Sequence, residues 1–130
     1  MSESKPYLLT FFERAGYVHA TVVASEINYQ SAMDYLREVT DETRRLGFTR
    51  VMIERDIPAN LNDADTFRVA ADATVLFQGL KIALLNKYHQ NKSSLRFAAT
   101  VASNRGSKYE YFDSRSKAEA WLLSDRKTGQ

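Results

Sequence analysis

The loop formed by residues 86–94 holds the side chains of this sequence that are best suited to bind an anion. It follows an apolar run, Leu80–Leu85, and precedes a stretch with helical periodicity. Ligands of α/β proteins commonly bind where a strand ends and a helix begins, because the first amides of the helix are free to donate hydrogen bonds. The side chains that would join those amides are Lys87, His89, Lys92 and Ser94, with Arg96 in the first helical turn.

An ordinary solvated loop explains the same residues without a ligand. In that interpretation Ser94 caps the following helix and the lysines face water. A second charged pair, Arg55 and Asp56, follows the predicted buried strand Thr49–Glu54. Since the carboxyl ends of parallel strands share one edge of a sheet, we expect both residues on the rim beside the loop.

Residues suited to covalent or acid–base catalysis are sparse in the chain. Cysteine is absent, there are two histidines, and neither a Gly-x-Ser-x-Gly motif nor a glycine-rich phosphate loop occurs. His19 lies in an alternating strand pattern, so we expect it on a sheet face. We therefore predict that the protein is not an enzyme. The alternative left open is an enzyme that uses Glu54, Asp56 or His89 as acid or base.

Metal binding has little support in the sequence. Asp63 and Asp65 stand two positions apart at a predicted helix start, so their side chains diverge by about 200° around the helix. Capping and the helix dipole explain both residues. Glu54 and Asp56 have no histidine near them in the sequence. We predict neither a metal nor a cofactor.

Length and composition predict a single folded domain. A chain of 130 residues that is 44% hydrophobic can bury a full core. The absence of cysteine and of any run of 18 apolar residues favours a cytoplasmic protein without a membrane span. Residues 1–80 carry a net charge of −4 (8 minus 12), and residues 81–130 carry +6 (10 minus 4). These charges are dispersed, so we do not expect nucleic-acid binding.

Hydrophobic periodicity predicts an α/β domain with a mixed five-stranded sheet and four helices. The predicted strands are Tyr7–Phe12, Tyr17–Ala24, Thr49–Glu54, Leu80–Leu85 and Lys108–Phe112. Helices are expected over residues 29–46, from Asn62 or Asp63 to Gly79, from Ser94 to Asn104, and after Asp113 or Ser114. We expect Asn28 to cap the first of these helices and Phe67 to lie in the inner stripe of the second. The order ββαβαβαβα implies a hairpin followed by parallel strands. The domain should span residues 7–123, with flexible segments at 1–6 and 124–130.

Four stretches of the chain carry a family resemblance. They are Lys81–Leu85, Phe97–Gly106, Tyr111-Phe112 and Ala118–Leu122. Together with the order of elements they resemble the SpoIIAA-like family, whose members are small bacterial proteins with the STAS fold. The resemblance extends over roughly residues 7–123. It implies a shape related to anti-sigma-factor antagonists and compared with the CRAL-TRIO lipid-binding domain.

The segment after the third predicted strand departs from the antagonists of that fold. In those proteins a phosphorylatable Ser or Thr stands at the start of the next helix, where a phosphate meets the positive end of the helix. Here residues 54–62 contain no hydroxyl side chain, and the next one is Thr66, too far into the helix. The resemblance therefore does not bring a phosphorylation switch to this chain.

We predict a non-enzymatic cytoplasmic module with a regulatory or binding role. It would bind a small anionic ligand in the crevice at the strand ends, or a protein partner on its helical surface. An edge strand would also permit a homodimer. The first alternative is a carrier of an apolar anion such as a fatty acid, with its head group on Lys87, Lys92 and Arg96. The second is the acid–base enzyme described above.

Overall fold

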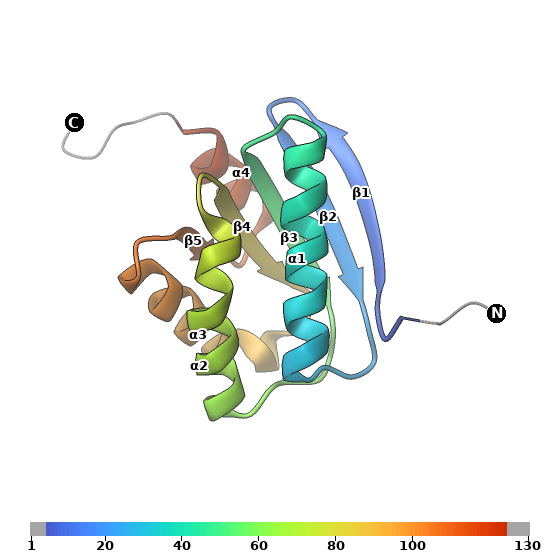
Figure 1. Ribbon diagram of the computed structural model, residues 1–130, viewed down its shortest axis with the longest axis vertical. Coiled ribbons are helices and arrows are strands. Elements are labelled where there is room, and N and C mark those ends of the chain that lie inside the picture. The colour runs from blue at the N-terminus through green and yellow to red at the C-terminus, as the bar shows by residue number, and fades with distance from the viewer. Residues whose placement is uncertain (1–4, 125–130) are drawn as a thin grey trace.

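The strands of this protein form one mixed sheet. The computed structural model describes residues 5–124, so most of the two segments predicted to be flexible lie outside the described part. The strands lie side by side in the order in which they occur along the chain. They are β1 (Leu8–Arg14), β2 (Tyr17–Val23), β3 (Arg50–Asp56), β4 (Lys81–Asn86) and β5 (Lys108–Tyr111). β1 runs antiparallel to β2, and β2 to β5 are parallel, which confirms the predicted hairpin and mixed sheet (Figure 1).

Helices follow all the strands except the first. The α-helices are α1 (Tyr29–Arg45), α2 (Asp63–Asp72), α3 (Lys92–Asn104) and α4 (Arg115–Leu123). Short 3-10 segments, η1 (Ala73–Phe77) and η2 (His89–Asn91), end α2 and precede α3. The predicted order ββαβαβαβα is therefore confirmed. None of the described helices is long and apolar enough to cross a bilayer.

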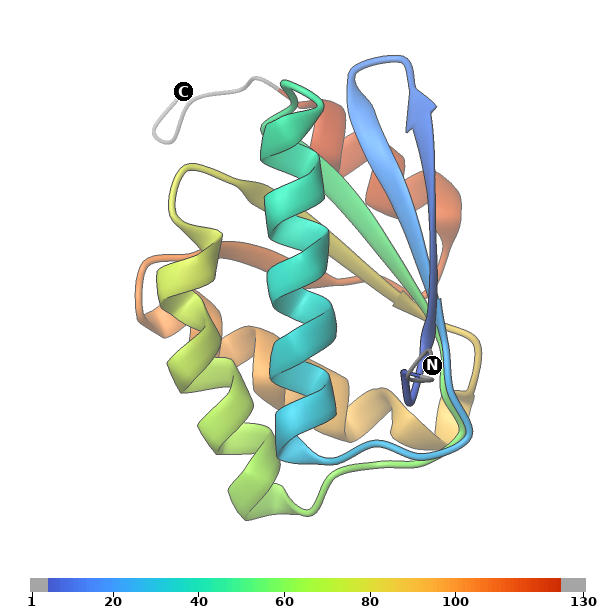
Figure 2. The same cartoon turned by 45° about the vertical axis from the view of Figure 1, so that its right-hand side comes forward.

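The helices that connect parallel strands, α1, α2 and α3, cover one face of the sheet. Connections between parallel strands are almost always right-handed. Because the strand order advances in one direction only, such connections place their helices on the same side. Figure 2 shows α1 and α2 in front of the sheet and α4 behind it. The core between them includes Val22, Ile53 and Leu84 from the sheet and Val39 and Ala99 from the helices.

The opposite face is covered by α4 over only part of its width. Ala118 and Leu122 of α4 pack on a second apolar cluster that includes Met52 and Leu85 of the sheet. The face of the hairpin on this side remains open. Three of its large apolar side chains, those of Leu8, Phe12 and Val23, are 64%, 48% and 43% exposed.

Local capping signals position the helix ends. The side chain of Asn28 accepts a hydrogen bond from the backbone amide of Ser31 at 2.8 Å, and the amide of Asn28 donates to the Ser31 hydroxyl at 3.1 Å. This reciprocal pair satisfies two amides at the start of α1. The hydroxyl of Ser114 accepts from the amide of Lys117 and begins α4 in the same manner. The predicted caps at Asn28 and Ser114 are confirmed.

The start of α3 differs from the prediction. The helix begins at Lys92, and η2 leads directly into it, so Ser94 lies in the first turn and does not cap the helix. Asn91 occupies the cap position, but its amide group donates to the carbonyl oxygen of Ile57 at 3.0 Å. The loop after β3 therefore holds this residue, which is a long-range contact that local sequence does not reveal.

Two further expectations need correction. The hairpin turn is shorter than predicted, because β1 continues to Arg14 and only residues 15–16 connect the strands. Gly16 has φ +89°, a conformation that favours glycine. Phe67 was expected in the inner stripe of α2 but is 44% exposed. The buried positions of α2 are Thr66, Val69 and Ala70, so the stripe is rotated away from Phe67.

We expect Leu122→Ala to lower the free energy of unfolding by about 2–4 kcal/mol, because it leaves a cavity under the one helix on that face. Leu122 is fully buried. Urea denaturation followed by circular dichroism measures the change. Val75→Ala is the control, since Val75 is 67% exposed and its truncation should change stability by less than about 0.5 kcal/mol. Equal effects of the two variants would show that α4 does not stabilise the sheet.

Candidate functional site

Arg55 lies in the interior although it carries a permanent charge. Its side chain is on the α1–α3 face of β3, two positions after Ile53, and the residue is 5% exposed. Among the described residues it is the one lysine or arginine that is buried. Its guanidinium donates to the side-chain oxygen of Asn86 at 3.0 Å. No carboxylate of the described residues forms an ion pair with it, so a buried positive charge is balanced only by a neutral amide.

Arg55 borders a small cavity at the carboxyl ends of the parallel strands. The cavity has a volume of about 50 Å³ and lies between the sheet and helices α1, α2 and α3. Most of its wall is apolar. The apolar side chains include Leu36, Val69, Leu84 and Leu95. Ligands of open α/β sheets bind at this edge.

Hydroxyl groups line the same cavity. Tyr35 reaches it from α1, Tyr109 from β5 and Ser94 from the first turn of α3. Burial raises the pKa of Tyr109, and the neighbouring Tyr35 raises it further, while Arg55 acts in the opposite direction. The Tyr109 hydroxyl therefore keeps its proton at neutral pH and can donate a hydrogen bond.

Tyr35 and Tyr109 both line the cavity, and neither hydroxyl forms a hydrogen bond with another described residue. Among the described residues, the one side-chain polar atom that is both sealed from solvent and without a partner is Oδ1 of Asn91. The hydroxyls of Tyr35 and Tyr109 are not in that position, so both keep some contact with space that solvent can reach. The cavity thus combines one cation with neutral donors.

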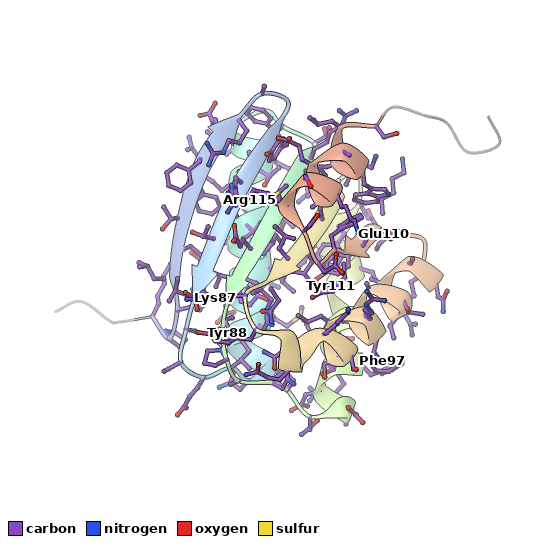
Figure 3. All side chains as sticks on the ribbon, turned by 180° about the vertical axis from the view of Figure 1, so that it is seen from behind. Lys87, Tyr88, Phe97, Glu110, Tyr111 and Arg115 are labelled. Atoms are coloured by element: carbon purple, nitrogen blue, oxygen red, sulfur yellow. The ribbon has the colours of Figure 1, made fainter. Side chains whose placement is uncertain are left out.

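The structure separates the residues predicted as ligand contacts into groups. Arg55 and Ser94 meet at the cavity. Asp56 is the next residue after Arg55, and its side chain lies on the other face of the sheet. There its carboxylate accepts from the Tyr88 hydroxyl at 3.0 Å and pairs with the Lys87 ammonium at 3.6 Å. Figure 3 shows Lys87 and Tyr88 together at the end of β4.

The two cations of α3 lie away from the cavity at Arg55 and away from the Lys87–Asp56 pair. Lys92 lies 4.0 Å from the carboxylate of Asp113, and the guanidinium of Arg96 lies 5.7 Å from the centre of the Tyr111 ring. Both partners belong to β5 or to the residues just after it. The side chain of His89 lies outside the part of the chain that the structure describes. Lys87, Lys92 and Arg96 therefore do not converge on one head group.

A cluster of charged residues on the α4 face includes one of the predicted acid–base candidates. Glu54 accepts a hydrogen bond from Nε2 of the buried His19 at 2.8 Å and another from Arg115 at 2.9 Å. Nδ1 of His19 lies 3.5 Å from the guanidinium of Arg14. His19 lies on a sheet face, as predicted. The carboxylates of Glu54 and Asp56 are both held by cations, and neither residue lines the cavity at Arg55.

A larger depression of about 760 Å³ lies at the opposite edge of the sheet, where β3, β4 and β5 begin. Four cationic residues line it, namely Arg50, Lys81, Arg105 and Lys108. The Lys81 ammonium donates to the carbonyl oxygens of Trp121 and Ser124 at 2.7 and 2.9 Å, so the end of α4 engages this cation. The smaller cavity is the better candidate, since Arg55 there is buried without an anionic partner.

Tyr35 and Tyr109 were not predicted as site residues. The helical pattern could have placed Tyr35 on the inner stripe of α1, since it follows Ala32 by three positions and precedes Val39 by four. The burial of Arg55 could also have been predicted, because strand alternation places it on the same face as Val51 and Ile53. Nothing in the sequence indicates that these three elements bring their polar groups to one cavity.

Comparison with known proteins supports the fold and leaves the function open. No family model matches the chain, and no curated protein matches its sequence. A solved structure from Shewanella loihica is similar: an uncharacterized protein from the DUF3478 family with a SpoIIAA-like fold. The match covers 95% of this chain and 98% of that one, with a TM-score of 0.52 and 11% identity. The predicted SpoIIAA-like fold is therefore confirmed.

We expect Arg55→Met to leave the free energy of unfolding of the ligand-free protein unchanged or to raise it by about 1–3 kcal/mol. Removing a buried charge avoids its desolvation cost, and Met occupies a similar volume. Urea denaturation without added anions measures the effect. Arg44→Met is the matched control and should lower stability, because Arg44 donates to the carbonyl oxygens of Leu76 and Gln78. A loss above about 1 kcal/mol in Arg55→Met would show that Arg55 has a structural role.

Proposed function

We propose that this protein is a non-enzymatic binding module whose ligand is a small anion held by Arg55. The observation that carries this proposal is the burial of the Arg55 guanidinium, 5% exposed, beside a cavity and without a carboxylate partner. Burying a charge costs several kcal/mol unless an opposite charge compensates it. A bound anion would supply that compensation.

The arrangement of the other charges supports binding rather than catalysis. A general acid or base must reach the substrate, usually from a pocket. Glu54 is bonded to His19 and Arg115, and Asp56 to Lys87 and Tyr88, all outside the cavity at Arg55. Apart from Arg55, neutral polar and apolar side chains line that cavity. It therefore suits retention of a ligand better than proton transfer.

Regulation by phosphorylation has no support at the position used by anti-sigma-factor antagonists. Thr66 is the first hydroxyl residue after β3, and it is 5% exposed. Its hydroxyl donates to the carbonyl oxygen of Asn62 at 2.9 Å within the first turn of α2. A kinase would have to unfold this turn to reach it. A regulatory role, if the protein has one, would depend on ligand binding or on a partner.

The carrier that the sequence suggested as an alternative was expected to hold its ligand in the crevice at the strand ends, with other cations than Arg55. Its head group was expected on Lys87, Lys92 and Arg96, whose side chains face Asp56, Asp113 and Tyr111. Arg55 replaces them in the present proposal. A cytoplasmic location and a protein partner stay predictions. A homodimer also stays a prediction, for which β1 would be the edge strand.

We expect at least one small anion to bind with a stoichiometry of one per chain and to raise the thermal unfolding temperature. The probes are sodium propionate, sodium decanoate and inorganic phosphate, each tested by isothermal titration calorimetry. Arg55→Met should weaken binding by about tenfold or more, the loss expected for a charge-assisted hydrogen bond.

The control is the double variant Lys87→Ala/Lys92→Ala, which removes two positive charges from the rim and leaves Arg55 in place. It should bind the anions with nearly unchanged affinity. The proposal is wrong if no probe binds, or if binding survives in Arg55→Met and disappears in the double variant.

A further inference from the structure

The chemical groups around Arg55 restrict the charge of the ligand. Among the described residues that line the cavity, Arg55 is the one that carries a positive charge. A carboxylate carries a single negative charge and would be balanced by it. A phosphate monoester carries between −1.5 and −2 near neutral pH. Its second charge would remain without a partner in a largely apolar environment, which is costly.

The donors around the cavity match the two oxygens of a carboxylate. A guanidinium has five N–H groups in one plane and binds carboxylates through two of them. One group donates to Asn86, and the others remain for a ligand. The hydroxyls of Tyr35 and Tyr109, which have no partner among the described residues, can donate to the same oxygens.

The cavity is partly open to solvent, and its volume restricts the part of the ligand that it can enclose. One water needs roughly 10–15 Å³ of space measured in this manner. A cavity of about 50 Å³ therefore has room for three to five atoms of that size. The carboxylate group supplies three of them, which leaves space for a body of at most two carbons. Leu36, Val69 and Leu84 make the wall suitable for an apolar body.

The geometry points to a short-chain monocarboxylate of two or three carbons as the ligand, bound by the Arg55 guanidinium and selected by the hydroxyls of Tyr35 and Tyr109. This inference rests on the proposed function, since it assumes that an anion occupies the cavity at Arg55. It differs from the fatty-acid carrier in that the cavity encloses the whole ligand, whose chain is short. The two tyrosines act as specificity residues, because they add neutral donors and no second positive charge.

The test compares propionate, decanoate and inorganic phosphate by isothermal titration calorimetry against the wild type and three Tyr→Phe variants. Propionate should bind at least tenfold more tightly than either of the other anions. Tyr35→Phe and Tyr109→Phe should each weaken propionate binding about three- to tenfold, the loss expected for one hydrogen bond. Tyr111→Phe is the matched control on the same strand. Its ring contacts Arg96 outside the cavity, so its affinity should not change.

The outcomes separate this inference from the proposed function. Tighter binding of phosphate or decanoate than of propionate, lost in Arg55→Met, would overturn the inference and leave the proposed function standing. Full propionate affinity in both Tyr35→Phe and Tyr109→Phe would overturn the role of the hydroxyls. Failure of all three anions to bind would overturn the inference together with the proposed function. Circular dichroism of each variant confirms that a loss of affinity does not come from a loss of fold.

Discussion

The strand order determines where everything else in this protein can lie. Each parallel strand is added to the same edge of the sheet, so right-handed connections bring α1, α2 and α3 to one face. That face becomes a thick layer in which the helices meet near the carboxyl ends of β3 and β4. Of the described helices, α4 alone lies on the other face, and its nine residues cover part of the sheet. The cavity, the deep core and the open hairpin face all follow from this arrangement.

The same alternation that builds the sheet separates its charges. Successive side chains of a strand point to opposite faces. On β3 this places Glu54 and Asp56 on the α4 side, where cations and hydroxyls reach them, and places Arg55 on the other face among neutral polar and apolar groups. Residues that are neighbours in sequence therefore have opposite electrostatic environments. Cations neutralise the acidic residues, whereas the buried Arg55 borders a cavity and has the neutral side chain of Asn86 as its hydrogen-bond partner.

The sequence predicted elements well where the signal was local. The caps at Asn28 and Ser114 and the order of strands and helices required only nearby residues and periodicity. Predictions that depended on distant contacts were less accurate. Ser94 lost its predicted capping role because Asn91 is held by the loop after β3. The inner stripe of α2 was misplaced at Phe67, since the packing of α2 against its neighbours selects the buried face.

The sequence by itself determined the α/β class, the hairpin, the parallel strands that follow it and the presence of charged residues at the strand ends. These properties depend on hydrophobic periodicity and on turn residues, which can be recognised in short stretches of the sequence. The tertiary structure decided which of those charged residues share a site. Lys87, Lys92 and Arg96 diverge, while Arg55, Tyr35 and Tyr109 meet from three elements. Convergence of this kind depends on how helices pack across a sheet, and no spacing along the chain encodes it.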